Sequence, residues 1–241
     1  MATLFVSDLH LDPARPRITE LFARFLECEA RAADALYILG DLFESWVGDD
    51  DPSEAGVRVA SALAALHARG VPAWFMHGNR DFLLGEAYAR RAGLRLLADP
   101  TELTLHGQRV LLMHGDTLCT DDTAYQAFRR QTRDPAWQAQ FLAQPLAARL
   151  AFAAQAREAS RLRQGELRDA GSMESITDVA PAAVAEAFAR HDAAVLIHGH
   201  THRPAIHRDG ARTRIVLGDW FEQGSVLRVD ATGMRLEGLA A

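Results

Sequence analysis

Short apolar runs alternate with longer stretches of helical periodicity in the first part of the chain. Strands are expected at Thr3–Val6, Ala35–Leu39 and Ala73–Met76, because each is a brief apolar run of the kind that forms buried strands. Between them, apolar residues recur at helical spacing over Ile18–Ala32 and Glu54–Arg69, and a Gly and a Pro follow the second stretch. Strands joined by helices in this way predict an α/β fold.

The later part of the chain is richer in strands. A helix is expected over Leu83–Ala92. Strands are then expected in the order Glu102–Leu105, Val110–Met113, Ala194–Ile197, Arg214–Leu217, Ser225–Val229 and Met234–Glu237. Strands and helices that alternate in the first part of the chain, followed by a strand-rich end, predict a layered αββα sandwich of two mixed sheets flanked by helices.

The middle of the chain differs from both ends. From about Thr120 to Arg168 it has no strand pattern, only helix-favouring residues interrupted at Pro135 and Pro145. We therefore predict one domain over residues 1–241, with a helical cap inserted at about 120–175. The apolar residues of this insert either cover a binding site or form only the insert's own core.

Composition limits the function classes. A chain of 241 residues that is 49% hydrophobic and 24% charged is ordinary for a globular domain with an insertion. Its net charge of -6 argues against general nucleic-acid binding. The two cysteines, Cys28 and Cys119, make no disulfide framework, and the start MATLFVSDLH does not resemble a signal peptide. We expect a cytoplasmic protein, and no obligate protein partner is evident.

Polar side chains follow five of the expected strands. Strand carboxyl ends face the ligand crevice of an open α/β sheet, so these side chains are expected to converge. Each motif alone is more typical of a turn or a packed histidine, but the five together offer oxygen and imidazole donors and no thiol. They are Ser7-Asp8-Leu9-His10, Gly40-Asp41, Gly78-Asn79-Arg80-Asp81, His114-Gly115-Asp116 and Gly199-His200-Thr201-His202.

This donor set is typical of a centre with two cations. Two cations about 4 Å apart need a shared anion between them, and Asp41 is the candidate. Asp8 and His10 can reach one metal from one turn, while His200 and His202 can be divided between the two metals. Asn79 and His114 add an amide oxygen and another imidazole. Such a mixed set suits Mn²⁺, Fe²⁺, Co²⁺ or Zn²⁺ better than Ca²⁺ or Mg²⁺.

The ordered motifs resemble those of the calcineurin-like metallophosphoesterases. The longer runs SDLHL, ILGDLFE, MHGNRDFL, LMHGDTLCTDD, IHGHTHRP and LGDW are similar to the UDP-2,3-diacylglucosamine diphosphatase family of lipid A biosynthesis. This resemblance extends from the first expected strand to the last. It implies hydrolysis of the pyrophosphate bond of UDP-2,3-diacylglucosamine to UMP and 2,3-diacylglucosamine 1-phosphate (lipid X).

The resemblance also implies roles for individual residues. Two Mn²⁺ ions per chain are implied, one held by Asp8, His10, Asp41 and His202 and the other by Asp41, Asn79, His114 and His200. The implied catalytic residues are Asn79, Arg80 and His200, and the implied substrate contacts are Asn79, Arg80, Asp122, Ser160, Gln164 and His200. Gln164 stands where the family commonly has Asn. The chain has no lysine, so Arg163 or Arg168 is expected to replace the family's lysine.

Arg80 is informative about the leaving group. Many relatives in the superfamily have a histidine here that protonates a leaving alcohol, whereas an arginine does not give up its proton near neutral pH. A phosphate monoester leaves readily as an anion, so Arg80 favours cleavage within a pyrophosphate link. Our hypothesis is that a hydroxide bridging the metals attacks the phosphorus that bears the uridine. The alternative for Arg80 is a surface ion pair with Asp81 or Glu86.

The insert suggests contact with lipid. Its apolar residues are expected to line a chamber for acyl chains. Its arginines are expected to face phosphate or an anionic membrane surface, giving peripheral attachment to the cytoplasmic face of the inner membrane. They are Arg129, Arg130, Arg133, Arg149, Arg157, Arg161 and Arg163. The alternative is an ordinary amphipathic cap with its arginines in water.

Other readings of the whole chain and of single residues stay open. A broad phosphodiesterase or nucleotide pyrophosphatase would share the metal frame, and a scaffold that had lost catalysis would share the fold. Asp116 and Asp219 are expected to make turn hydrogen bonds, and Asp122 to cap a helix beginning near Thr123. Residues 49–51, all Asp, form either a rim near the metals or a solvated acidic loop.

Overall fold

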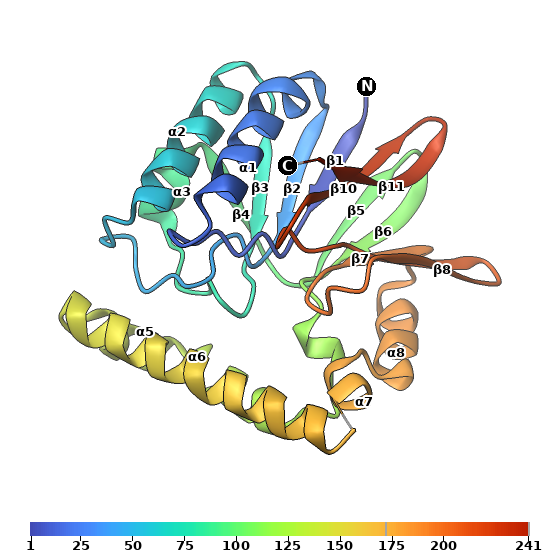
Figure 1. The fold of residues 1–241 in the computed structure, drawn as a ribbon. Coiled ribbons are helices and arrows are strands. Elements are labelled where there is room, and N and C mark those ends of the chain that lie inside the picture. The colour runs from blue at the N-terminus through green and yellow to red at the C-terminus, as the bar shows by residue number, and fades with distance from the viewer. Residues whose placement is uncertain (172, 241) are drawn as a thin grey trace.

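Two β-sheets pack face to face in the computed structural model, which describes residues 1–171 and 173–240 (Figure 1). The first sheet has the order β11 (Gly233–Leu239), β10 (Gly224–Asp230), β1 (Thr3–Val6), β2 (Ala35–Leu39), β3 (Ala73–Met76) and β4 (Leu94–Leu97). The second has the order β5 (Thr101–Leu105), β6 (Gln108–Leu112), β7 (Val195–His198), β9 (Arg212–Val216) and β8 (Ala205–Asp209). Both are mixed, with parallel strands at β1–β4 and at β6, β7 and β9.

Helices cover the outer faces of the two sheets, which confirms the predicted αββα sandwich. The first sheet is flanked by α1 (Pro16–Cys28), α2 (Glu54–Ala68) and α3 (Glu86–Ala92), and the second by α8 (Pro181–His191) (Figure 1). Short 3-10 turns lie at Ala30–Ala32 and Asp116–Leu118. Between the sheets lies an apolar layer that includes Phe5, Leu39, Met76, Leu112, Ile197 and Leu227. Burial of such side chains is the main force that holds the layers together.

Most of the expected strands and helices are present, and some of the described elements were not expected. Strands β1, β2 and β3 have the predicted bounds. The unexpected elements are β4, β8, α8 and the short 3-10 turn at Asp116–Leu118. In β8, Ala-Ile-His-Arg-Asp is half-exposed to exposed and has no apolar alternation, so its sequence carries no strand pattern.

The middle of the chain forms α4 (Thr123–Thr132), α5 (Pro135–Leu142), α6 (Leu146–Asp169) and α7 (Met173–Thr177). The expected interruptions at the two prolines are confirmed. Pro135 is the first residue of α5, directly after its N-cap Asp134, and Pro145 immediately precedes α6. Figure 1 shows α5 and α6 beside the sandwich rather than within its layers. The helical character of this region is confirmed, whereas its description as a cap within one domain stays a prediction. Residue 172, in the predicted insert, lies outside the described residues.

Two arginines of these helices are bound by the sandwich itself. Arg149 is 2% exposed and donates to the carbonyl of Val47 (2.6 Å) and to Oδ1 of Asp50 (2.8 Å). Arg133 donates to the carbonyl of Gly78 at 2.8 Å. The expectation that these two cations face phosphate or lipid was therefore wrong, because buried backbone carbonyls take their donors. Among the described helices, none is long and apolar enough to cross a bilayer.

Candidate metal centre and active site

The predicted ligands sit on strained turns at the carboxyl ends of the strands. Asp8 (φ 54°) and His10 (φ 48°) follow β1, Asp41 (φ 53°) follows β2, and His200 (φ 70°) and His202 (φ 55°) follow β7. Residues other than glycine rarely adopt this left-handed conformation, and each costs about 1–3 kcal/mol. Strain of this kind concentrates at functional sites, and here it turns the side chains toward one another.

One group of donors gathers around His10. Its Nε2 lies 3.2 Å from Nε2 of His202 and 3.7 Å from Oδ2 of Asp41. His202 Nε2 is also 3.4 Å from Oδ1 of Asp8. Four predicted ligands from three strand ends therefore surround one point, which is the set expected for one of the metals.

The second group gathers around the amide oxygen of Asn79. That oxygen lies 3.0 Å from Nε2 of His114 and 2.8 Å from Nδ1 of His200. His114 Nε2 is in turn 3.9 Å from Oδ1 of Asp41. The two carboxylate oxygens of Asp41 thus face different groups of donors, as a bridging ligand requires.

The buried charges of the two groups fit divalent cations. Asp8, Asp41 and His114 are almost fully buried, and ligand atoms of all three lie within 4.8 Å of one another. Burial tends to lower the pKa of His114, yet Asp41, Asp116 and Asp8 together raise it to about 9. Burial and neighbouring His114 lower the pKa of His200 to about 4, which leaves its ring neutral and able to bind a metal. Oxygen and imidazole donors that include buried carboxylates suit divalent transition metals.

Asp81 connects two of the turns that carry predicted ligands, a role that the sequence did not indicate. Its fully buried carboxylate accepts backbone N–H groups of Leu42 at 2.7 Å and Gly78 at 2.9 Å. One side chain therefore fixes both the turn that carries Asp41 and the turn that carries Asn79. Burial, and then the charge of Asp41, raise the pKa of Asp81 to about 7.

Arg80 lies beside the metal centre and not against the carboxylates expected as its surface partners. Its backbone N–H donates to Oδ1 of Asp41 at 2.8 Å, and its guanidinium lies 3.9 Å from Glu44. The ion pair with Asp81 or Glu86 is therefore wrong: Asp81 is occupied by backbone N–H groups, and the acidic neighbour of Arg80 is Glu44. The guanidinium borders the cavity described next.

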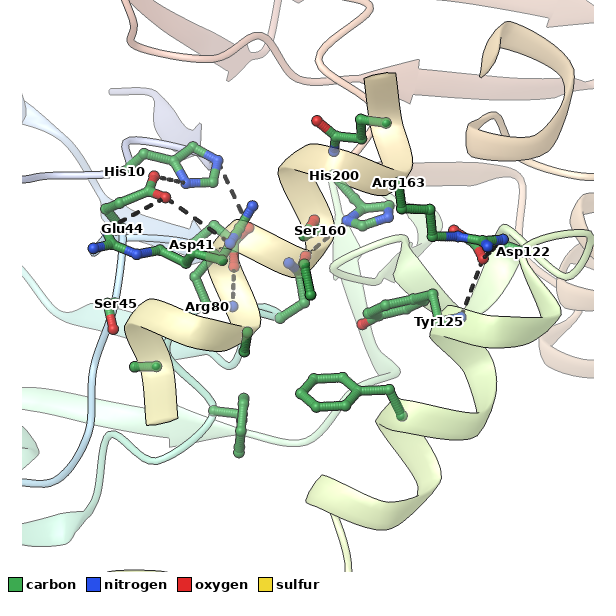
Figure 2. A pocket seen from close by; sticks show the side chains of 18 of the residues that line it. His10, Asp41, Glu44, Ser45, Arg80, Asp122, Tyr125, Ser160, Arg163 and His200 are labelled. Atoms are coloured by element: carbon green, nitrogen blue, oxygen red, sulfur yellow. Dashed lines mark hydrogen bonds and ion pairs between the residues drawn. The ribbon is translucent and has the colours of Figure 1, made fainter. Parts of the chain in front are cut away.

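A cavity of about 700 Å³ opens over the donors, with α6 along one side (Figure 2). Among the predicted substrate contacts, Asp122, Ser160 and Gln164 line it together with Asn79, Arg80 and His200. Arg163 lines it as well and pairs with Asp122 at 3.1 Å, whereas Arg168 is not among the lining residues. Asp122 also caps α4, accepting the N–H of Tyr125 at 3.1 Å, as expected.

The cavity has a strongly apolar stretch. Aromatic rings from the sandwich and from the inserted helices meet there, with Trp137 and Phe141 stacked at 4.9 Å and Phe152 edge-on to Phe141 at 5.2 Å. Phe82, Phe128 and Ala153 line the same cavity. A cavity with polar donors at its floor and aromatic rings along one stretch fits an amphipathic substrate.

Asp49 and Asp116 bind other groups of the protein, whereas Asp219 lies next to a predicted ligand. Asp49 accepts N–H groups from the Trp46 ring, Gly85 and Tyr88, so it is neither a metal rim nor a solvated residue. Asp50 is exposed, as expected for a solvated acidic loop, and pairs with Arg149. Asp116 goes beyond a turn role, because Tyr125 and Arg129 (2.7 Å) both donate to its buried carboxylate. Arg129 is therefore another cation of the insert that faces protein. Asp219 makes the expected turn, accepting the N–H of Phe221 at 3.2 Å, and its carboxylate also lies 3.7 Å from Nδ1 of His202.

Comparison with known proteins points the same way as the geometry. The family model for calcineurin-like phosphoesterases matches residues 1–204. A curated protein of Xanthomonas campestris pv. campestris (strain B100), named UDP-2,3-diacylglucosamine hydrolase, is 66% identical, with 100% of both chains covered. A protein of the same name from Stenotrophomonas maltophilia (strain K279a) is 65% identical, covering 100% of this chain and 99% of that protein.

Proposed function

Since this chain belongs to the calcineurin-like phosphoesterase family, we propose that it hydrolyses the pyrophosphate bond of UDP-2,3-diacylglucosamine to UMP and 2,3-diacylglucosamine 1-phosphate. The single observation that carries the proposal is the placement of oxygen and imidazole donors at the floor of a cavity with an aromatic stretch. Relatives with that activity in their name match over the full length. An acylated nucleotide sugar has both the anionic centre and the apolar part that such a cavity fits.

We assign one metal to Asp8, His10, Asp41 and His202 and the other to Asp41, Asn79, His114 and His200, with Mn²⁺ as the proposed ion. Divalent metals held there would supply an activated water and neutralise phosphate charge. The two-sided position of Asp41, 3.7 Å from His10 and 3.9 Å from His114, supports its role as the shared ligand.

The side chains around the metals orient the substrate. Arg80 borders the cavity with a guanidinium suited to phosphate oxygens, and its charge would stabilise the departing phosphate. Asp122, Ser160 and Gln164 offer hydrogen bonds to sugar hydroxyl or amide groups. The aromatic rings of Trp137, Phe141 and Phe152 would exclude water around the acyl chains.

Substrate comparison tests this proposal. Hydrolysis of UDP-2,3-diacylglucosamine is measured with Mn²⁺ against UDP-sugars without acyl chains, a cyclic nucleotide and a nitrophenyl phosphodiester. The diacyl substrate is expected to have the highest kcat/KM by a wide margin, with UMP as a product. Comparable kcat/KM for all four substrates would instead support a broad phosphodiesterase.

We also propose that the inserted helices touch an anionic membrane on its cytoplasmic face. The exposed apolar residues Leu142, Leu150 and Leu162 lie on α5 and α6, which also carry the exposed cations Arg161 and Arg168. Apolar side chains flanked by arginines suit a lipid surface. Sedimentation with vesicles containing an anionic lipid is expected to decrease in a Leu150→Ser, Leu162→Ser double variant, and unchanged sedimentation would contradict the membrane contact.

A further inference from the structure

Phe221 is a large apolar side chain held at the edge of the metal centre. It is 41% exposed, and its ring stacks against that of His10 with centroids 5.3 Å apart and planes 18° apart. The ring of His202 meets it edge-on at 5.2 Å. Phe221 also lines the cavity. Phe221 therefore presents an aromatic ring to the cavity beside two of the predicted metal ligands.

The loop around Phe221 is rigidly anchored. The preceding residue, Trp220, is fully buried between Phe22 and Phe25 at centroid distances of 5.6 and 5.7 Å. Its backbone N–H donates to the carbonyl of Asp8, and its ring N–H donates to the carbonyl of Ser225. The loop therefore presents Phe221 in a fixed position next to the metal ligands, and a preorganised ring binds a partner at a lower entropic cost.

One arginine lies over this ring, and Glu44, 3.8 Å from that arginine, links it to a second arginine. The guanidinium carbon of Arg15 lies 4.8 Å from the centroid of Phe221, and the same side chain donates to the carbonyl of His10. Arg157 of α6 lies 3.9 Å from Glu44 and 3.6 Å from Asp12. Guanidinium donors suit the carbonyl oxygens of a pyrimidine base, and a carboxylate suits its imide N–H.

No part of the substrate has yet been assigned to the end of the cavity near His10 and Phe221. The aromatic stretch around Trp137 suits acyl chains, and the side near Asp122 and Ser160 offers hydrogen bonds to a sugar. Figure 2 shows His10 and Glu44 on one side of the cavity, Asp122 and Tyr125 on the other, and Ser160 and His200 between them. The nucleoside and the lipid-bearing sugar are joined through the pyrophosphate, so they must extend from the metal centre in different directions. The His10 side is therefore available for the nucleoside.

We propose that Phe221 and Arg15 form the surface on which the nucleoside base of the substrate stacks. This inference rests on the proposed function and adds the part of the site that binds the nucleotide half. Stacking on an aromatic ring contributes substantial affinity and tolerates different bases. The uracil ring would lie beside Phe221, with its phosphate at the metals and the acylated sugar on the far side of His200.

Binding of UMP and of ribose 5-phosphate, each measured by calorimetry with Mn²⁺ present, tests the assignment. The two ligands share ribose and phosphate and differ in the base. Phe221→Ala is expected to weaken UMP binding about tenfold and to leave ribose 5-phosphate within twofold. Phe221→Trp is expected to retain UMP affinity. Val57→Ala, which shortens an exposed apolar side chain of α2 outside the cavity lining, is the control and is expected to leave both affinities unchanged.

Several outcomes would overturn the assignment. They are wild-type protein that binds UMP no more tightly than ribose 5-phosphate, a Phe221→Ala variant that binds UMP normally, and equal weakening of both ligands in that variant. A base-specific loss in Tyr125→Leu, with none in Phe221→Ala, would place the base on the other side. Hydrolysis of UDP-2,3-diacylglucosamine by the same wild-type preparation is scored separately. Base-specific UMP binding without that hydrolysis would contradict the proposed function and leave the stacking surface intact.

Discussion

Nδ1 of His10 lies 3.1 Å from a carboxylate oxygen of Glu44, while Nε2 of the same ring faces Asp41 and His202. Glu44 therefore lies behind the ring, on the side away from the other predicted ligands. A carboxylate behind a histidine ligand fixes the orientation of the ring and raises its basicity. The other carboxylate oxygen of Glu44 lies 3.9 Å from the guanidinium of Arg80 and 3.9 Å from that of Arg157.

Glu44→Gln is therefore expected to weaken metal binding. The amide keeps the size of the side chain but loses the charge behind His10, so Mn²⁺ affinity should fall about tenfold at the site that contains His10. Calorimetric titration with Mn²⁺ measures this change. Glu158→Gln, on the exposed surface of α6, is the matched control and should titrate as wild type. Equal Mn²⁺ affinity in both variants would show that Glu44 does not position His10.

Arg80→Lys distinguishes the role of the guanidinium from that of the backbone N–H of this residue. The backbone N–H that supports Asp41 remains in the variant, so Mn²⁺ binding should be unchanged. Lysine cannot contact two phosphate oxygens in the planar geometry of a guanidinium, so kcat should fall by more than KM rises. Steady-state kinetics on the diacyl substrate gives both values. An increase in KM at constant kcat would restrict Arg80 to ground-state binding.

Arg149→Ala tests how the inserted helices are fixed. The change leaves the carbonyl of Val47 without its donor, and such loss costs about 1–3 kcal/mol. The helices should then detach more often, and trypsin should cut within 146–169 faster than in wild type. Arg161→Ala is the control, since that side chain is 71% exposed and pairs with Glu158 within its own helix. Equal cutting rates in the two variants would contradict an anchoring role for Arg149.

The two cysteines are expected to differ in reactivity toward iodoacetamide. Burial, and then the nearby charge of Asp116, raise the pKa of Cys119 to about 12, so at pH 8 only about one thiol in ten thousand is a thiolate. Cys28 is exposed. Native protein at pH 8 should gain one label, Cys28→Ser none, and the denatured protein two. Mass spectrometry counts the labels, and rapid native labelling of Cys119 would contradict its burial.

The donor set was predictable because its residues occupy a repeated sequence position. Each of the seven predicted ligands directly follows a short buried strand, and the rule that strand ends share one edge of a sheet is enough to bring them together. The structure places Asp41 between His10 and His114, as the sequence suggested. The sandwich was predictable for another reason: its buried strands have a strong apolar pattern and alternate with helices early in the chain.

The supporting residues were not predictable in this way. Asp81 and Asp49 bind backbone groups of turns distant in sequence, and such pairings depend on the packed fold rather than on local pattern. The arginines of the insert all carry the same charge, yet Arg149 and Arg133 face protein and Arg161 faces water, because burial and available carbonyls decide their orientation. Phe221 carried one weak signal, an aromatic residue directly after the Gly-Asp-Trp that follows β9.

Asp41→Asn removes the charge of the proposed bridging ligand and keeps the size of its side chain. Asn tolerates the left-handed backbone of this position and keeps an oxygen for the N–H of Arg80, so the fold should persist. Calorimetric titration of metal-free protein with Mn²⁺, with elemental analysis of the bound metal, tests the shared role of Asp41 most directly. Wild type is expected to bind two Mn²⁺ per chain and Asp41→Asn at most one. Fewer than two in wild type, or two of wild-type affinity in the variant, would contradict a centre of two metals bridged by Asp41.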